Sequence, residues 1–448
     1  MHQAEPLGRP FTVTHRMVLA IAAPMTLAYL TTPLLGIVDT AVVGQLGDAA
    51  LLGGLAAGAV VFDVVFSGFN FLRSGTTGLV AQAYGRGATA DERLILLRAM
   101  LLAIVIGVAV TLLAPLISHA GQVFMGADAA VNAALDEYVR IRCLGSPFSL
   151  LNYALLGYVL GRGEGALGLG LQLILNLSNI VLSVIFGLWM GWGVAGVAWG
   201  TVCGEVIGLM VGLLIMFRRF RDHPPIDSAR LFSRTAFGEM LTLNRDIMIR
   251  SMALLAAFAL FTRTGAQFGT LTLAANAVLM NFFLMAGFYL DGFATAAEQL
   301  AGRAYGARAR SSFIEAVKLT MIWGFGLAAL SFLFFLFWGN SLIAIITTSQ
   351  DVRDLAAVYL PWAAVTALTG ALAFQMDGVY IGATWSRDMR NMMLLALAIF
   401  VAAVYTLTNL FGNHGLWAAL NLFLVARGVA LLSLLPKRLR TMPQPTLT

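Results

Sequence analysis

Apolar residues form long runs along the whole chain, and short polar stretches separate these runs. A helix needs about 20 apolar residues to cross a bilayer, and about twelve runs reach that length. They lie at 17–40, 50–72, 94–118, 138–160, 166–188, 194–217, 241–263, 272–294, 314–338, 357–380, 391–411 and 415–435. The short alternating segments typical of a membrane β-barrel are not found in the sequence. The pattern therefore predicts an all-α polytopic membrane protein with about twelve transmembrane helices.

Basic residues concentrate in every second connection between these runs. They are Arg86, Arg93, Arg162, Arg218, Arg219, Arg221, Arg230, Arg234, Arg303, Arg308, Arg310, Arg387, Arg390, Lys437, Arg438 and Arg440. The intervening connections, such as 118–137, carry almost no Lys or Arg, and Arg353 is the main exception. Because cytoplasmic loops carry the excess of positive charge, both termini are predicted to be cytoplasmic. Residues 1–16 lack the apolar core of a cleavable signal peptide, so the first span is expected to direct insertion.

Composition supports a membrane protein and narrows its partners. The chain is 59% hydrophobic and only 11% charged, whereas soluble domains are about one quarter charged. The net charge of +6 comes from the short cytoplasmic loops, so we expect a lipid bilayer and no nucleic acid as the partner. The two cysteines, Cys143 and Cys203, make neither a disulfide framework nor a metal site, and no cofactor is expected.

The longest polar connection divides the chain into two halves. It contains Pro224 and Pro225 and predicts a cytoplasmic linker at 218–239, between an N-terminal lobe at 1–217 and a C-terminal lobe at 240–448. Several residues of the first half recur 221 positions later. They are Ala83, Tyr84, Gly85, Tyr138, Gly157 and Gly161, which recur as Ala304, Tyr305, Gly306, Tyr359, Gly378 and Gly382. This spacing predicts a duplication that gives two pseudo-symmetric six-helix lobes, related by an axis along the membrane normal.

The first span contains one ionisable side chain, that of Asp39. A carboxylate at membrane depth costs roughly 2.5–3.5 kcal/mol and is usually functional, so Asp39 is expected to carry a proton or bind a cation. Pro24 and Pro33 lie in the same span and remove backbone hydrogen bonds, which makes Pro24 a candidate hinge that responds to the charge of Asp39. The alternative is a structural aspartate that bonds a neighbouring hydroxyl group.

Polar side chains also line the fifth and sixth spans. Asn176, Asn179 and Ser183 fall on one helical face, and Thr201 and Glu205 are four residues apart. Such oxygen-rich groups suit a hydrated proton or a hard cation, although polar contacts between membrane helices, worth about 0.6–2 kcal/mol each, use the same residue types. The candidate substrate-lining residues are Asn152, Tyr153, Asn176 and Glu205.

The second half carries its own charges at membrane depth, on Arg250, Asp291 and Asp377. Arginine and aspartate at such depth usually pair, so we expect structural ion pairs or a gate more than substrate contacts. Asp63 on the second span is a further candidate acid.

Five motifs together resemble the MATE (multidrug and toxic compound extrusion) family. Residues 38–47, VDTAVVGQLG, and 191–201, GWGVAGVAWGT, resemble the signatures of that family. Residues 244–250, NRDIMIR, with 274–279, AANAVL, and 290–294, LDGFA, are similar to the DinF branch. The resemblance extends over essentially the whole chain and implies twelve helices in two six-helix lobes. It also implies export of small organic, often cationic compounds by antiport against protons or sodium ions.

The resemblance carries over to the coupling residues position by position. In the family an aspartate of the first span works with an asparagine and an aspartate of the fifth span and a threonine of the sixth. Asp39, Asn179 and Thr201 match, whereas Ser183 stands where the second aspartate is expected. One negative charge is therefore missing, which favours H+ over Na+ as the coupling ion. Asp246 and Asp377 lie on the seventh and tenth spans, where other branches use acids, but they do not match that motif.

Alternative functions remain open at this stage. A lipid-linked precursor flippase would need a cationic cavity for pyrophosphate, and the first half offers an acid instead. A membrane-embedded enzyme is disfavoured because there is no HExxH motif, no paired acids with a histidine and no serine nucleophile motif. A nucleotide-driven pump is disfavoured because there is no phosphate-binding Gly-Lys-Ser/Thr loop. We expect a monomer in a bacterial inner membrane.

Overall fold

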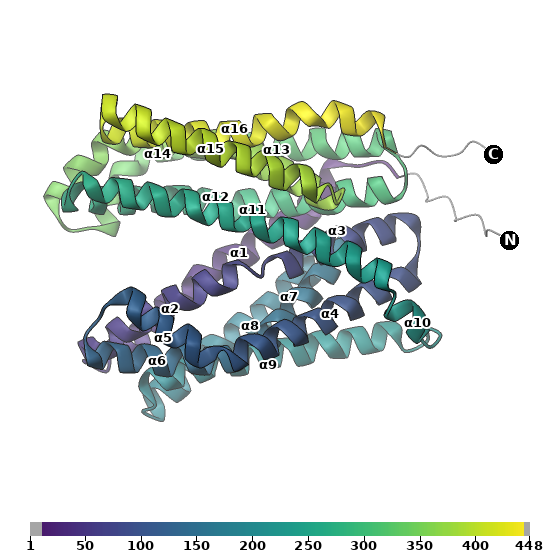
Figure 1. Cartoon of the computed structure of the whole chain (residues 1–448), viewed down its shortest axis with the longest axis horizontal. Helices are drawn as coiled ribbons and strands as arrows, with labels where there is room; N and C mark the ends of the chain where they lie inside the picture. Colours follow the sequence, from purple (N-terminus) through teal and green to yellow (C-terminus); the bar gives the residue numbers. More distant parts are fainter. Residues whose placement is uncertain (1–10, 443–448) are drawn as a thin grey trace. The chain divides into compact units, whose positions relative to one another are not determined.

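The computed structural model describes residues 11–442, which are helices joined by turns, without a strand in that range (Figure 1). The helices of the first part are α1 (His15–Gly44), α2 (Ala49–Ser67), α3 (Phe71–Arg86), α4 (Thr89–Leu112), α5 (Ala114–Met125), α6 (Ala129–Leu144), α7 (Ser146–Gly161), α8 (Gly165–Val184), a π-helical turn (Ile185–Trp189) and α9 (Gly193–Phe220). The remaining helices are α10 (Ser228–Leu231), α11 (Arg234–Gln267), α12 (Thr270–Gly306), α13 (Arg310–Ile346), α14 (Gln350–Gly382), α15 (Ser386–Phe411) and α16 (Asn413–Arg440).

Eleven helical segments of the described chain are long and apolar enough to cross a membrane, and there are twelve if the bent pair α6 and α7 is one span. The prediction of an all-α polytopic membrane protein is confirmed. Two segments are longer than the apolar runs suggested. α3 continues the second span to Arg86, and α11 begins at Arg234 inside the predicted linker.

The described chain forms two compact units. The N-terminal unit contains residues 27–80 and 88–244, and the C-terminal unit contains residues 11–26, 81–87 and 245–442. The start of α1 and the end of α3 therefore pack with the second half of the sequence. The predicted boundaries of the lobes at 217 and 240 stay a prediction, because these compact units are not continuous in sequence.

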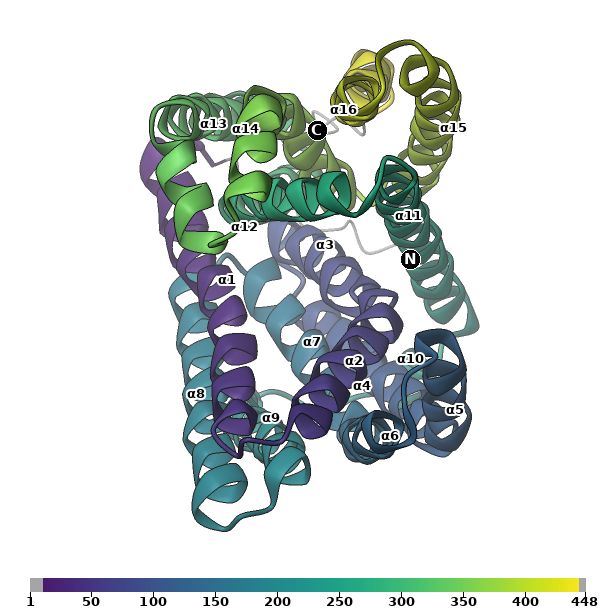
Figure 2. The same ribbon diagram turned by 90° about the vertical axis from the view of Figure 1, so that its left-hand side faces the viewer.

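In the N-terminal unit, α8 packs along α9, α4 packs along α7 and α2 packs along α6 (Figure 2). Glycines at every fourth position of α9 let it approach its neighbours, which are α8, the π-helical turn and α7. These glycines are Gly196, Gly200, Gly204, Gly208 and Gly212. A Cβ atom on Gly200 would lie 2.5 Å from the Ser183 backbone nitrogen, and one on Gly204 would lie 2.8 Å from that of Asn179. Because small residues allow membrane helices to approach closely, this spacing sets the distance between the two helices.

The fourth span is bent by 50° between α6 and α7. Pro147 has no N–H group to donate to the carbonyl of Cys143 four residues earlier. The Thr111 hydroxyl group of α4 donates to that carbonyl instead, at 2.8 Å. Gly107 makes room for the bend, because a Cβ atom there would lie 2.5 Å from the Pro147 Cα. The neighbouring helix α4 therefore stabilises the bend.

The C-terminal unit is built around α12, α14 and α16, with α15 along α16 and α13 along both α12 and α14 (Figure 1). Its core contains large aromatic side chains that are almost fully buried, among them Phe261, Phe400 and Trp417. Asn276 and Asn413 exchange two amide hydrogen bonds of 2.7 and 2.9 Å inside this core. These bonds satisfy polar groups that would otherwise be buried without a partner.

Glycine contacts repeat at the predicted offset. A Cβ on Gly157 would lie 2.5 Å from the Arg73 carbonyl, and a Cβ on Gly378 would lie 2.2 Å from the Ala294 carbonyl. Gly378 and Ala294 follow Gly157 and Arg73 by 221 residues each, so the second contact repeats the first.

The repeated Ala-Tyr-Gly motifs also pack on each other inside the C-terminal unit. A Cβ on Gly85 would lie 2.1 Å from the Arg303 carbonyl, and a Cβ on Gly306 would lie 2.1 Å from the Gln82 carbonyl. Gln82 and Arg303 are also 221 residues apart, so the contact is reciprocal. These repeated contacts support the predicted duplication.

One predicted connection is mostly helical. Residues 118–137 form a connection between two spans in the sequence prediction, but most of them belong to α5 and α6. Gly126 adopts a left-handed backbone conformation, with φ of 59°, and ends α5. The loop is thus reduced to residues 126–128, and the polar side chains lie on helical faces.

Candidate functional site

The predicted coupling residues come from three helices of the N-terminal unit and meet at one place. Asp39 on α1 is half-buried, and its Oδ1 atom is buried without a hydrogen-bond partner among the described residues. Its carboxyl group lies within hydrogen-bonding reach of Ser183 on α8. A buried acid with an unsatisfied oxygen is costly unless it is protonated or receives a ligand.

Ser183 connects the acid to the other two residues. Its hydroxyl group donates to Asn179 Oδ1 at 3.1 Å and approaches the Val197 carbonyl at 3.5 Å. Thr201 donates to the same carbonyl at 3.1 Å. Asn179, Ser183 and Thr201 are buried, so the structure brings all four predicted coupling residues into one polar cluster. We call Asp39, Asn179, Ser183 and Thr201 the coupling cluster.

The glycines of α9 position this cluster. Gly200 faces the backbone of Ser183, and Gly204 faces that of Asn179. Larger residues at these positions would push α8 away from α9 and separate Ser183 from the Val197 carbonyl.

Asn176 makes a different contact from the coupling cluster. Its amide nitrogen donates to the Thr31 hydroxyl oxygen on α1 at 2.7 Å. Thr31 and Asp39 are eight residues apart on α1, and Asn176 and Ser183 are seven residues apart on α8, so two polar contacts join the same pair of helices. The predicted role of Asn176 in lining a substrate site stays a prediction, but its amide group is bonded within the protein.

Glu205 lies in a second buried cluster, which contains a residue that the sequence interpretation missed. Arg142 Nη1 lies 3.0 Å from Glu205 Oε1, and Ser149 donates to Glu205 Oε2 at 2.6 Å. Asn152 donates from its amide group to the Glu205 backbone carbonyl at 2.8 Å. The Arg142 guanidinium carbon lies 4.1 Å from the centre of the Phe62 ring, within the range of a cation–π contact. Two predicted substrate-lining residues, Asn152 and Glu205, therefore hold α7 against α9.

Tyr153 and Asp63 both interact electrostatically with Arg142. Tyr153 is half-buried on α7, and Asp63 is exposed on α2 within the N-terminal unit. Arg142 was detectable from the sequence, because it is a charged residue inside the predicted span 138–160. A charged side chain inside an apolar span is costly and usually has a partner or a function, and this holds for Arg142 as it does for Asp39.

The predicted charges of the C-terminal unit form a triad around Asp377. Arg250 and Arg427 both donate to Asp377 Oδ2, with a distance of 2.5 Å for Arg427. Asp291 interacts electrostatically with Arg427. The sequence interpretation named Arg250, Asp291 and Asp377 but missed Arg427, which lies inside the predicted span 415–435. With Asp291 counted, two arginines balance two carboxylates, so the group has no excess negative charge to hold a metal cation.

Asp246 has separate partners in the same unit. It accepts hydrogen bonds from Arg390 at 2.7 Å and from Ser386 at 3.1 Å. The position is almost fully buried, so Asp246 connects α11 to the start of α15. Within residues 11–442, no three His, Cys, Asp or Glu side chains are grouped closely enough to hold a metal ion.

The candidate hinge residue Pro24 lies inside a continuous helix. α1 runs from His15 to Gly44 without a break at Pro24 or Pro33. Pro24 belongs to the C-terminal unit and Asp39 to the N-terminal unit. Bending at Pro24 in response to the charge of Asp39 stays a prediction.

Comparison with known proteins supplies the family. The MatE family profile matches residues 24–185 and 247–407, once in each half of the chain. The chain belongs to the MatE family. This is a family of transporters, and its two matches agree with the duplication seen in the glycine contacts. The recognition made from the five motifs is confirmed.

Individual relatives extend the match over most of the chain. The chain is 39% identical over 415 residues to DNA damage-inducible protein F of Escherichia coli (strain K12), covering 92% of this chain and 90% of that protein. It is 26% identical over 442 residues to the probable multidrug resistance protein NorM of Rhizobium meliloti (strain 1021), covering 93% and 92%. A crystal structure of a MATE protein in the straight conformation has the same fold, with a TM-score of 0.87 over 96% of each chain at 18% identity.

Proposed function

We propose that this MatE protein exports lipophilic, often cationic organic compounds in exchange for protons that bind at Asp39. The observation that carries the proposal is the coupling cluster. It places one buried carboxyl group, with an unsatisfied oxygen, beside the Ser183 hydroxyl group and the Asn179 amide group. A carboxyl group in such surroundings is stabilised in its neutral form, so it can accept a proton from water and release it again.

The hydrogen-bond pattern supports a proton more than a metal cation. A serine hydroxyl group has one hydrogen, and that of Ser183 is directed to Asn179 Oδ1. Its lone pairs are then available to accept a hydrogen bond from Asp39 in its protonated form. A sodium ion would find one carboxylate in this cluster, since Ser183 replaces the aspartate that the family resemblance implies.

The proposed substrate class rests on the relatives. The NorM relative is named a probable multidrug resistance protein, and the chain matches it over nearly its full length. An acid that gains and loses its charge can bind a proton in one state and a cationic compound in the other. A ligand shifts a conformational equilibrium only when its affinity for the two states differs. Protonation of Asp39 must therefore lower the affinity for the exported compound.

The test is efflux of a fluorescent lipophilic cation from proteoliposomes under an imposed pH gradient or an imposed sodium gradient. We expect efflux to follow the pH gradient in the wild type and to be lost in Asp39→Asn, which is neutral at every pH. Glu137→Gln, an exposed change on α6, is the matched control and should leave efflux unchanged. Wild-type, gradient-driven efflux by Asp39→Asn would rule out the proposal.

The alternative activities give different results in the same assay. Sodium-coupled export would respond to the sodium gradient alone. A lipid-linked precursor flippase would need a free cationic group, but Arg142 of the N-terminal unit is paired with Glu205. Turnover of a substrate without any gradient would instead indicate an enzyme.

We further propose that the protein is a monomer of the bacterial inner membrane with both termini in the cytoplasm. The many apolar helices make it an integral membrane protein, and the relative from Escherichia coli supports a bacterial setting. The distribution of arginines between alternate connections supports the orientation. Labelling of single cysteines placed in the two sets of connections tests the orientation directly.

A further inference from the structure

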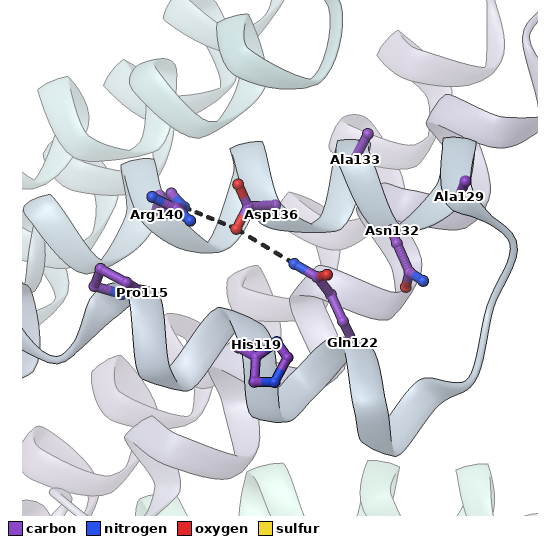
Figure 3. Close-up of a pocket in the computed structure, with 8 residues that line it drawn as sticks. All are labelled: Pro115, His119, Gln122, Ala129, Asn132, Ala133, Asp136 and Arg140. Carbon is purple, nitrogen blue, oxygen red and sulfur yellow. Dashed lines mark hydrogen bonds and ion pairs between the residues drawn. The ribbon is translucent and has the colours of Figure 1, made fainter.

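A polar pocket of about 580 Å³ lies between α5 and α6 in the N-terminal unit (Figure 3). All of its lining residues come from these two helices. They are Pro115, His119, Gln122, Ala129, Asn132, Ala133, Asp136 and Arg140. The pocket contains no member of the coupling cluster, so it is a separate site. Its volume is within the range of pockets that bind small ligands or headgroups.

The helix α5 has three faces with different surroundings. Ala114, Ser118 and Gly121 are buried. Pro115, His119 and Gln122, at spacings of four and three residues, point towards α6 and line the pocket (Figure 3). The third face is apolar and exposed. It contains Leu116, Val123 and Phe124, with exposed fractions of 63, 70 and 83%. The apolar face adjoins the pocket face along the helix.

The length of α4 places the next helix, α5, at the membrane boundary. α4 has 24 residues and is therefore about 36 Å long, which exceeds the roughly 30 Å of the hydrocarbon core. The chain turns at Leu113, so α5 begins where α4 leaves the core on the side opposite the basic loops. A helix with one apolar and one polar face at this depth is expected to lie in the interface, with its apolar face among acyl chains.

The polar groups of the pocket are only partly satisfied. Asp136 Oδ1 accepts hydrogen bonds from Ser118 at 2.6 Å, Arg140 at 2.7 Å and Gln122 at 3.3 Å. All three donors reach the same oxygen, which leaves Oδ2 available. The Asn132 amide nitrogen donates to the Ala127 carbonyl at 2.8 Å, but Asn132 Oδ1 is buried and has no partner within the described chain.

The pocket also presents positive and neutral donors. The Arg140 side chain is 52% exposed and bonds Asp136 through Nε, so its two terminal nitrogens face outwards. His119 is exposed on the opposite wall (Figure 3). The site therefore offers hydrogen-bond donors from Arg140 and His119 and acceptors from Asp136 Oδ2, beside Arg140, and from Asn132 Oδ1, one turn further along α6 (Figure 3).

We propose that this pocket binds the zwitterionic headgroup of a phospholipid that carries a phosphodiester and a primary ammonium group; its place in the outer leaflet rests on the orientation proposed above. Arg140 and His119 bind the phosphate oxygens, because guanidinium and imidazole groups donate to phosphate. Asn132 and Asp136 accept the ammonium hydrogens. The acyl chains lie along Leu116, Val123 and Phe124, which are otherwise exposed.

Other headgroups complement the pocket less well. An anionic glycerol headgroup can offer Asn132 Oδ1 only neutral hydroxyl donors, which bind more weakly than an ammonium group, and its net negative charge faces the Asp136 carboxylate. A quaternary choline headgroup has no N–H group at all. One hydrogen bond that involves a charged group contributes about 1.5–3 kcal/mol, so the primary amine should be preferred about tenfold or more.

Native mass spectrometry of the full-length protein tests the proposal, with equimolar dioleoyl lipids that carry ethanolamine, glycerol or choline headgroups. We expect about tenfold higher retention of the ethanolamine lipid. Asn132→Leu, which removes the acceptor, should reduce this preference to about threefold or less, whereas Arg140→Gln, which removes a phosphate donor, should lower the retention of all three lipids. Glu137→Gln, next to Asp136 but off the pocket face, is the matched control and should retain the preference. His119→Gln provides a third variant if Arg140→Gln fails to fold.

Two results would overturn the proposal. Equal retention of the three lipids by the wild type would show that the pocket does not discriminate between headgroups. Binding of soluble phosphoethanolamine or inorganic phosphate without a preference among the lipids would show a site for a soluble anion instead. Both readouts are independent of export, so a failure of the proposed transport mechanism does not affect them.

Discussion

The Glu205 carboxylate bridges the two halves of the bent fourth span. Its Oε1 atom bonds Arg142, which precedes the bend at Gly145, and its Oε2 atom bonds Ser149, which follows it. The side chains of Arg142 and Glu205 are only 8% and 9% exposed. Both the electrostatic pair and the geometry of the bend therefore depend on one carboxylate of α9.

Removal of Glu205 is expected to destabilise the N-terminal unit strongly. Glu205→Ala leaves the Arg142 guanidinium buried without its charge partner, which costs about 3–5 kcal/mol in comparable pairs. Thermal unfolding in detergent should show a much lower midpoint than for the exposed control Glu137→Ala. In the double variant Arg142→Met/Glu205→Met, no charge remains buried, so stability should recover in part. A double variant that is less stable than either single variant would contradict the ion-pair assignment.

Thr111 is expected to matter only because Pro147 lacks an N–H group. Thr111→Val removes the side-chain donor to the Cys143 carbonyl, at an expected cost of about 1–3 kcal/mol. Pro147→Ala restores a backbone donor four residues after Cys143 and should make Thr111→Val less costly. Thermal unfolding of the two single variants and the double variant measures this coupling. If the losses of stability in the two single variants simply add in the double variant, the Thr111 hydroxyl group does not substitute for the N–H group that Pro147 lacks.

The contact between α8 and α9 should be sensitive to one methyl group at Gly200. Gly200→Ala places a Cβ atom 2.5 Å from the Ser183 backbone nitrogen, so the helices must separate, at a cost of about 1–3 kcal/mol. We expect a lower unfolding midpoint and reduced proton-driven efflux. Gly170→Ala on α8 is the matched control, because nothing lies within 4 Å of its added Cβ. It should be neutral or stabilise the helix by up to about 1 kcal/mol.

A second acid in the coupling cluster should change the ion response. Ser183→Asp adds a carboxylate next to Asp39 and Asn179, which supplies the negative charge that a sodium site needs. We expect efflux from proteoliposomes to gain a dependence on the sodium gradient that the wild type lacks. Ser178→Asp on the same helix, outside the cluster, controls for the added charge. An unchanged response to sodium would show that charge at this position does not select the ion.

Loss of the central carboxylate in the C-terminal unit should be severe. Asp377→Asn removes the carboxylate that Arg250 and Arg427 both bond and leaves only Asp291 near Arg427, with an expected loss of about 3–5 kcal/mol. Asp351→Asn, in the exposed first turn of the same helix, should cost less than about 1 kcal/mol. Unfolding midpoints of the two variants provide the comparison. Similar midpoints would show that the triad does not stabilise the unit.

Periodicity and charge predicted the number of spans because helices in a bilayer must satisfy every backbone group internally, which fixes their length. Asp39 and Asn179 were found because a polar residue in an apolar run is visible in the sequence. Arg142 and Arg427 were visible in the same way, but their partners were not. Which carboxylate each arginine meets depends on how distant helices pack.

The contacts that shape the site follow from tertiary packing. Glu205 was predicted to line a substrate site, but the bend at Gly145 brings Arg142 and Ser149 to its carboxylate. The pocket between α5 and α6 was not predicted, because residues 118–137 were interpreted as a connection between two spans. An i, i+4, i+7 count over 115–122 would have suggested a helical face.

The reciprocal contact of the two Ala-Tyr-Gly motifs limits how the two copies of the duplicated sequence can diverge. Gly85 is fixed by a carbonyl of the second copy, and Gly306 by a carbonyl of the first. A bulkier residue acquired by one copy would therefore strain the backbone of the other, because the facing carbonyl would have to move. Substitutions elsewhere in the two halves can accumulate independently, but Gly85 and Gly306 must be retained together.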